Sequence, residues 1–530
     1  MKTMNFINKY STGLVVAAAL TFTSCDDYLD KMPDNRATID SESKITALLT
    51  SAYPTAHFAY LTEMYSDNID NEAAPTYTTY QKLEDEAALW KDITFKDEDD
   101  DSPYAIWNTH YLAAASANEA IAAIEAMGTP DALKPQLGEA LMCRAYAHWV
   151  LVNVFCKAYS PKTSTTDLGI SYMDHPETDL SPKYDRGTVA KDYELIAKDI
   201  ERALPLMDDG YLKVPKYHFN RKAAYAFATR FYLQYTKDDK SNYDKAIQYA
   251  TVAINGDAAS AIRDWATVGN KAINGAVRAM AYTDASDNAN LLILSTNSLW
   301  ARVCGPYSLG YKYCHDNVIA NYETCAQNPW GSKSSLRFRI PQYSGMPKVI
   351  MAKTAEYFEY TDPVNGIGFA HDFFSIFTTD EVVINRAEAY IMKGEYDLAA
   401  DDLNAWGTKF YSAAKVKTAD EIAKFYADIK YYEPMDPTPK KKLNPDYTIE
   451  AGKQENMIHA VLAARRILQL HEGMRWFDVK RFGIEISRRS ILNNKVESII
   501  DFMSKDDPRR AIQLPQSVIT SGVTPNPRKN

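Results

Sequence analysis

Apolar side chains recur at helical spacing along most of the chain from Tyr104 onward. In the first stretch they repeat at three- and four-residue steps as far as Gly128. Gly128, Thr129 and Pro130 form a sequence that normally ends a helix. The next stretch, residues 141–159, is apolar on almost every side, which indicates a helix in the middle of the fold. These two stretches predict an antiparallel helix pair.

A short pattern occurs three times, at Tyr193, Tyr243 and Tyr396: the Tyr is followed by an acidic residue and by small or apolar residues three and seven positions on. The pattern resembles the second helix of a tetratricopeptide unit, and apolar stretches at 223–235 and 382–392 supply first helices for the last two copies. Amphipathic helices produce single copies by coincidence, but three copies favour a scaffold of tetratricopeptide-like helical pairs. Their uneven spacing argues against a regular solenoid.

Two regions interrupt the helical pattern. Residues 257–380 mix Gly, Pro, Asn and many aromatic residues with short β-prone runs at 291–295 and 348–351. Residues 431–447 are rich in proline and contain a lysine cluster. Such regions are typical of long loops that lie over a scaffold and carry function. The predicted fold class is therefore mainly α, with long irregular loops and a few short strands.

The first residues match a secretory signal. A basic start leads into an apolar run at residues 14–22 that is too short to span a bilayer as a mature helix. Ser24 then precedes Cys25, which resembles the lipobox of bacterial lipoproteins, although Phe22 stands where that motif prefers Leu. We therefore predict that residues 1–24 are a signal peptide and that the Cys25 thiol receives lipid. The alternative is an ordinary signal peptide with Cys25 as a plain residue.

We predict one domain over residues 25–530. Its helical-repeat scaffold is expected at about 25–256 and 380–430, a loop-rich binding region at about 257–380, and a C-terminal motif region at about 450–530.

The amino-acid composition and the net charge limit the classes of protein to which the chain can belong. The chain has 530 residues, 46% of them hydrophobic and 24% charged, which is the balance of a globular protein with a sizeable core. Its formal net charge is −10, and no run of Lys and Arg offers the positive surface that nucleic acid requires. A nucleic-acid partner is therefore excluded. No segment after the signal is apolar for long enough to span a bilayer, so we expect the rest of the chain to hang from its lipid.

Five cysteines follow Cys25. Cys143 and Cys156 lie in apolar helical stretches and are predicted to be inert core thiols. The other three lie in the loop-rich region of an exported chain, where one disulfide and one free thiol are expected: Cys304, Cys314 and Cys325. The sequence does not assign the pairing.

The sequence contains no complete motif for catalysis or for cofactor binding. His471 and Glu472 begin like a zinc-protease helix, but Arg475 stands where the second ligand is needed. The chain has no phosphate-cradling glycine loop, no nucleophile elbow and no cysteine pair at metal spacing. We predict a solvated loop for the acidic run at residues 97–101, with a structural calcium site as the alternative. We therefore predict no enzyme and no cofactor, while a glycosidase carboxylate pair stays open and unsupported.

The C-terminal quarter carries the most specific motif. Residues 472–483 read E-G-M-R-W-F-D-V-K-R-F-G, I-Q-L-P-Q follows at residues 512–516, and Asn526-Pro527 stands near the end. The chain thereby resembles the SusD/RagB family, whose members commonly read E-G-x-R-W-F-D-L-x-R-x-G and then I-P-Q with a terminal Asn-Pro. Val479 and Leu514 are conservative departures. The start of the mature chain and the first two long helices resemble the family as well.

The C-terminal motif itself is best explained as scaffold. Trp476 and Phe477 are expected to pack inward, while Glu472, Arg475 and Asp478 stand at helical spacing and are expected to pair with one another.

The resemblance implies a cell-surface lipoprotein without catalytic activity, built on a helical fold with four tetratricopeptide-like units. It would be held in outer-membrane lipid through acylated Cys25, face the cell exterior, and cap a SusC-like TonB-dependent transporter. There it would deliver glycan, an oligosaccharide, or in some members peptide. Asp26 and Asp27 resemble the family's surface-export signal. A peptide-binding RagB-like receptor and a helical-repeat adaptor without a nutrient ligand remain the alternatives.

No motif marks the ligand site, so we predict it from residue type and placement. Aromatic residues in loops have less core to enter than those in helix pairs, and they are expected to face solvent, where rings stack on sugars. They form two clusters, Tyr77, Tyr80 and Trp90 before the first long helix, and Trp300, Tyr307, Tyr311, Tyr313, Tyr322 and Trp330 in the central loops. Trp90, Trp300 and Trp330 are the leading candidates because indole offers the largest stacking face. The alternative is that each ring packs its own loop.

Overall fold

Paired helices form the scaffold. The computed structural model describes residues 39–94, 100–179, 183–272, 276–305, 309–341 and 346–529, and residues 41–530 form one compact unit. The predicted signal peptide, Cys25, Tyr307 and residues 97–99 of the acidic run lie outside the described residues.

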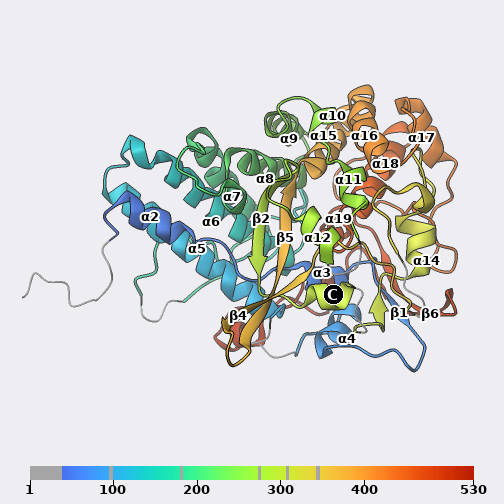
Figure 1. Cartoon of the computed structure of the whole chain (residues 1–530), viewed down its shortest axis with the longest axis horizontal. Coiled ribbons are helices and arrows are strands. Elements are labelled where there is room, and N and C mark those ends of the chain that lie inside the picture. Colours follow the sequence, from blue (N-terminus) through green and yellow to red (C-terminus); the bar gives the residue numbers. More distant parts are fainter. Residues whose placement is uncertain are drawn as a thin grey trace, which may run out of the picture. The chain divides into compact units, whose positions relative to one another are not determined.

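The two longest helices, α5 (Pro103–Ala126) and α6 (Lys134–Phe155), pack against each other (Figure 1). Ser102 caps α5 by accepting a hydrogen bond from Ala105 N, and Pro103 occupies the first helical position. From Gln136 to Phe155 every residue of α6 is buried. The predicted pair and the central position of its second helix are confirmed.

The three repeat copies each form a helix that packs against a neighbouring helix. The pairs are α7 (Val189–Ala203) with α6, α9 (Ser241–Ala253) with α8 (Arg221–Gln234), and α16 (Tyr396–Phe410) with α15 (Thr379–Lys393). A further pair is α17 (Ala419–Ala427) with α18 (Lys453–Leu468). The residues three and seven positions after each repeat Tyr have no exposed surface, which lets the paired helices approach closely. The predicted helical-pair scaffold is confirmed.

Short helices lie before, between and after the pairs. They are α2 (Glu42–Leu49), α3 (Ala59–Tyr65), α4 (Lys82–Ala88), α10 (Ala258–Ala261), α11 (Trp265–Gly269), α12 (Val277–Tyr282), α13 (Trp300–Cys304), α14 (Asn317–Ile319), α19 (Arg475–Arg481) and α20 (Gln516–Thr520).

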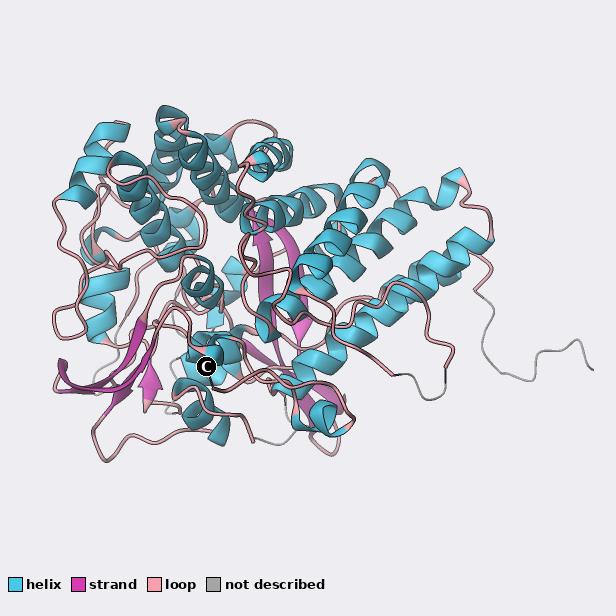
Figure 2. Ribbon diagram, turned by 180° about the vertical axis from the view of Figure 1, so that it is seen from behind, coloured by secondary structure: helices cyan, strands magenta, loops and turns pink. Residues whose placement is uncertain are grey.

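The described strands form two small sheets, drawn in magenta in Figure 2. One sheet has the order β3-β1-β6-β7, with β3 (Tyr313–Cys314), β1 (Asp70–Glu72), β6 (Ile486–Leu492) and β7 (Lys495–Met503). The other has the order β2-β5-β4, with β2 (Asn290–Thr296), β5 (Ile367–Thr378) and β4 (Glu356–Asp362). The β-prone run at 291–295 is thus confirmed. The run at 348–351 forms no named strand, because its main chain bonds a neighbouring loop instead: Val349 N donates to His315 O.

The C-terminal motif forms α19 and the turn before it. Trp476 and Phe477 are buried, as predicted. Glu472, Arg475 and Asp478 do not pair with one another, so this prediction is wrong. Each of them pairs with other residues instead, most of which are distant in the sequence. Glu472 accepts from Tyr282 Oη at 2.7 Å, Arg475 holds Asp67 at 2.8 and 2.9 Å, and Asp478 pairs with Arg465 and Arg481 at 3.1 Å each.

Gly473 lets this turn lie directly on α3. Its φ is +74°, and a Cβ atom there would stand 2.4 Å from Thr62 Oγ1 and 2.6 Å from Ala59 Cα. Beside it, Glu63 accepts hydrogen bonds from His471 N at 3.0 Å and Gly473 N at 3.2 Å. Burial raises the pKa of Glu63 to about 7.

A buried group of charges links the N-terminal part of the unit to its C-terminal part. We call it the Asp67 network, and it consists of Asp67, Glu323, Lys441, Arg466 and Arg475. Lys441 lies 2.7 Å from Asp67 and 3.2 Å from Glu323, and Arg466 lies 2.9 Å from Glu323. Burial alone would raise the pKa of Asp67, but the surrounding Arg466, Arg475 and Lys441 hold it well below its usual value. The lysine cluster of the proline-rich region therefore contributes to the core.

The described cysteines, Cys143, Cys156, Cys304, Cys314 and Cys325, are buried free thiols, so the disulfide expected among the last three is not formed. Over the described ranges, no group of three or more His, Cys, Asp and Glu side chains is placed to hold a metal ion. No helix in those ranges has both the length and the apolar character needed to cross a membrane.

Candidate functional site

The three predicted indoles are buried. Trp90 is 3% exposed, Trp300 1% and Trp330 4%. Each indole N–H donates inside the protein, to Tyr65 O at 2.8 Å, His471 O at 2.7 Å and Asn404 Oδ1 at 2.9 Å respectively. The expectation that these rings face solvent is wrong, because their loops fold back onto the scaffold and supply an acceptor for each N–H. A buried ring offers no stacking face, so we assign these residues to the core.

Three of the predicted tyrosines are half-buried, and we call them the tyrosine surface: Tyr77, Tyr80 and Tyr311. The rings of Tyr77 and Tyr311 meet edge to face with centroids 5.8 Å apart, although they come from the two separate predicted clusters. Tyr80 Oη accepts from Arg302 Nη1 at 3.1 Å. Tyr313 is buried, and Tyr322 is exposed. A ligand-binding role for the tyrosine surface stays a prediction.

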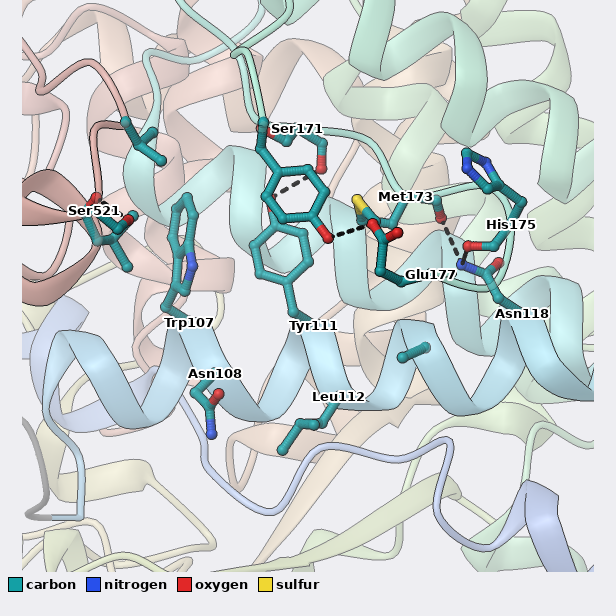
Figure 3. A pocket seen from close by; sticks show the side chains of 14 residues that line it. Trp107, Asn108, Tyr111, Leu112, Asn118, Ser171, Met173, His175, Glu177 and Ser521 are labelled. Atoms are coloured by element: carbon teal, nitrogen blue, oxygen red, sulfur yellow. Dashed lines mark hydrogen bonds between the residues drawn. The ribbon is translucent and has the colours of Figure 1, made fainter. Parts of the chain in front are cut away.

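A groove of about 330 Å³ lies beside the first half of α5 (Figure 3). Its other walls come from residues 171–177 with Tyr184, and from residues 518–523 near the C-terminus. The lining residues are Trp107, Asn108, Tyr111, Leu112, Ala115, Asn118, Ser171, Met173, His175, Glu177, Tyr184, Val518, Ser521 and Val523. We call this the Trp107 groove.

Trp107 is the one tryptophan with an accessible ring. All eight tryptophans lie within the described residues, and the other seven are buried. Figure 3 shows Trp107 and Tyr111 side by side on α5, and their ring centroids are 5.0 Å apart. Neither Trp107 Nε1 nor the Asn108 amide makes a hydrogen bond to any other described residue, and both residues line the groove. The result is an aromatic floor with free polar groups at its edge.

Hydrogen bonds hold the opposite wall against the helix pair. Tyr111 Oη donates to Ser171 O at 3.0 Å, and Asn118 Nδ2 donates to Met173 O at 3.0 Å and to His175 O at 3.1 Å. The walls therefore stand in place before a ligand arrives, which reduces the ordering cost of binding.

One carboxylate, Glu177, lines this wall, and a second, Asp174, belongs to the same stretch of chain. Glu177 Oε2 accepts from Tyr184 Oη at 2.6 Å, and this hydrogen bond lowers the pKa of Glu177. The hydrogen bond from His175 likewise lowers the pKa of Asp174. Both groups are therefore charged at neutral pH.

This arrangement suits a sugar ring. Sugars present an apolar C–H face, which stacks on an aromatic ring, and hydroxyl edges, which bond to amides, carboxylates and indole N–H groups. Concave sites with apolar walls and a few placed polar groups are the usual form of a small-ligand site.

Sequence reasoning missed Trp107 because its spacing with Tyr111 matches the face of α5 that pairs with α6. A signal was present at four-residue steps, where Trp107 and Tyr111 are followed by Ala115. The small side chain of Ala115, after the rings of Trp107 and Tyr111, leaves open space along this side of α5.

The chain resembles a known protein family and several solved structures. The family model described as SusD-like_3, starch-binding associating with outer membrane, matches residues 27–233. No curated protein sequence matches the chain.

Solved structures share the fold over almost the whole chain. A SusD superfamily protein from Bacteroides thetaiotaomicron is 19% identical with a TM-score of 0.56, over 91% of this chain and 98% of the other. A SusD superfamily protein from Bacteroides fragilis is 16% identical with a TM-score of 0.59, over 92% and 99%. A SusD-like carbohydrate binding protein from Bacteroides vulgatus is 12% identical with a TM-score of 0.57, over 91% and 96%. Identities this low establish the fold alone.

The chain thus has the fold of these SusD superfamily structures, and its residues 27–233 match the SusD-like_3 family model.

Proposed function

We propose that the chain binds glycan at the cell surface through the Trp107 groove and performs no catalysis. The observation that carries the proposal is the single accessible indole, which stands in the groove with an unpaired N–H. The description of the matching family as starch-binding, and the carbohydrate-binding neighbour from Bacteroides vulgatus, support this ligand class. The tyrosine surface is a second candidate contact for the same glycan.

We further propose that the chain is held in the outer membrane by acylated Cys25, faces the cell exterior and delivers its ligand to a SusC-like TonB-dependent transporter. The association with the outer membrane that the family description names supports this location. Three acyl chains on one residue are enough for firm anchoring, because two lipid chains already hold a protein stably.

Cys25→Ala tests the anchor. We expect this variant to leave the membrane fraction and appear as soluble protein, because no other segment of the sequence offers a hydrophobic anchor. Metabolic labelling with a fatty-acid analogue followed by membrane fractionation measures both steps. Ser24→Ala, which keeps a small residue before the cysteine, is the matched control and should remain in the membrane. Continued membrane fractionation of an unlabelled Cys25→Ala variant contradicts the anchor.

Trp107→Ala tests the groove. We expect glycan affinity to fall by roughly tenfold or more, because one stacked ring contributes on the order of 1–2 kcal/mol to binding. A glycan array identifies a binding oligosaccharide, with maltoheptaose in the first set, and calorimetry on the chain from Asp26 gives the affinity.

Two further variants keep this test interpretable. Trp107 also touches Phe155 with ring centroids 5.2 Å apart, so its removal costs some stability. Asn108→Ala leaves that contact intact and should still weaken binding. Trp330→Ala removes a buried indole outside the groove and should lower the melting temperature with unchanged affinity. Unchanged affinity in both groove variants, on a glycan that the parent binds, excludes the groove as the site; binding of peptides alone favours the RagB-like alternative.

A further inference from the structure

The lining of the Trp107 groove has an uneven distribution of charge. The part contributed by α5 has no charged side chain, and neither has the part contributed by residues 518–523. The wall of residues 171–177 contributes Glu177 and the imidazole of His175. No Lys or Arg belongs to the described lining, so a negative group on a ligand finds no counter-ion there.

Lys183, next to Tyr184 in sequence, is exposed and lies outside the groove lining, and two arginines near this wall are committed to the scaffold. Arg144 binds both carboxylate oxygens of Asp199, at 2.7 and 2.6 Å, and uses Nη1 for Asn118 and the main chain of Asp174. Arg186 donates to Gly169 O, Thr524 O and Asn526 Oδ1. Turning either guanidinium toward the groove would break these bonds.

Glu177 is held in place at the rim. Its Oε1 accepts from Asp179 N at 2.6 Å, and its Oε2 accepts from Tyr184 Oη at 2.6 Å. Each carboxylate oxygen retains a lone pair for a further donor. A sugar hydroxyl can donate to it in a charge-assisted hydrogen bond, whereas a sugar carboxylate or sulfate is repelled.

We propose that the Trp107 groove selects uncharged stretches of glycan and that Glu177 is the residue that rejects anionic sugars. The inference rests on the proposed function, because it concerns the ligand class of the same groove. The nearby carboxylate of Asp174 adds to the repulsion, and its contact with His175, 2.7 Å from Nδ1 to Oδ1, keeps the imidazole next to that carboxylate. Hydroxyl-rich neutral sugars gain hydrogen bonds at the rim, and uronic or sulfated sugars lose them.

The test compares ligands that differ in charge alone. A neutral oligosaccharide that binds, with maltoheptaose as the first probe, is oxidised at its primary alcohols to carboxylates, and part of the product is converted to the methyl ester. The carboxylate and its ester have the same ring and nearly the same size. We expect the wild-type chain from Asp26, which contains the whole compact unit of residues 41–530, to bind the ester about fivefold to tenfold more tightly than the carboxylate.

Glu177→Gln should remove most of this preference while keeping both contacts, because the amide oxygen can accept from Asp179 N and the amide NH2 can donate to the Tyr184 hydroxyl. The matched control is Glu119→Gln, which neutralises an exposed carboxylate of α5 outside the groove lining and should leave the preference unchanged. The wild-type preference should also shrink between about 0.02 M and about 0.5 M NaCl, since salt screens exposed charges. A purely structural role of Glu177 would not produce that salt dependence.

The outcomes separate this inference from the proposed function. Binding of the neutral oligosaccharide with equal affinities for ester and carboxylate overturns the charge selection and leaves glycan binding standing. Tighter binding of the carboxylate also overturns it. A preference that persists unchanged in Glu177→Gln overturns the assignment to this residue. Failure of every neutral glycan to bind overturns the proposed function and the inference together.

Discussion

Asp67→Ala should lower the free energy of unfolding by about 3–5 kcal/mol at neutral pH, because it leaves buried cations without their counter-ion. Arg475 makes both of its described ion-pair contacts to this carboxylate. Lys441 and Arg466 keep only Glu323 as an acidic partner, at 3.2 and 2.9 Å. Chemical denaturation of the chain from Asp26 measures the loss.

The pH dependence of this loss has a definite sign. The folded-state pKa of Asp67 lies well below the ordinary value, so its charge stabilises the fold above a pH of about 4, and that contribution disappears as the pH falls through the lowered value. The difference between wild type and Asp67→Ala should therefore be constant from about pH 5 to 7 and shrink in acid.

Asp131→Ala is the matched control, since Asp131 pairs with Lys134 at the surface with its side chain 91% exposed. Its loss should leave the free energy of unfolding almost unchanged. A cost this small for Asp67→Ala as well would show that the buried network contributes little to stability.

Trp476→Ala should cost about 3–5 kcal/mol of unfolding free energy and leave glycan affinity unchanged. The ring has no exposed surface and meets Tyr65 edge to face with centroids 5.5 Å apart, so truncation opens a cavity between α19 and α3. No residue of α19 lines the Trp107 groove. Thermal unfolding and calorimetry on the same preparation give both quantities.

Trp476→Phe fills most of that cavity and should cost about 1–2 kcal/mol. An unchanged melting temperature with lost binding in Trp476→Ala would instead assign the motif to ligand contact.

Local patterns predicted the helices well and the sheets poorly. Helical spacing is visible within a single segment, as in α5 and α6, and the repeat Tyr pattern located α7, α9 and α16. Strands such as β1, with three residues, exist only because β3 and β6 lie on either side, and no local pattern marks such a strand. The partner of Arg475 was missed for the same reason, because Asp67 lies 408 residues away.

The site was the least predictable part. A loop aromatic such as Trp300 becomes buried when a distant acceptor, His471 O, receives its N–H, and one sequence does not show that acceptor. Conversely, Trp107 has the spacing of a core residue, and its exposure depends on where residues 171–177 and residues 518–523 lie beside α5. Residue type correctly suggested an aromatic ring as the candidate stacking surface. Tertiary packing determines which aromatic ring is accessible.

The Asp67 network also determines when the molecule can become folded during its synthesis. The guanidinium of Arg466 reaches the main chain of Asp67, 399 residues earlier in the chain, and Arg489 reaches Asp70 across 419 residues. Contacts of such sequence separation form late and slowly. A chain that ends before Arg466 therefore leaves the carboxylates of Asp67 and Asp70 without these arginines.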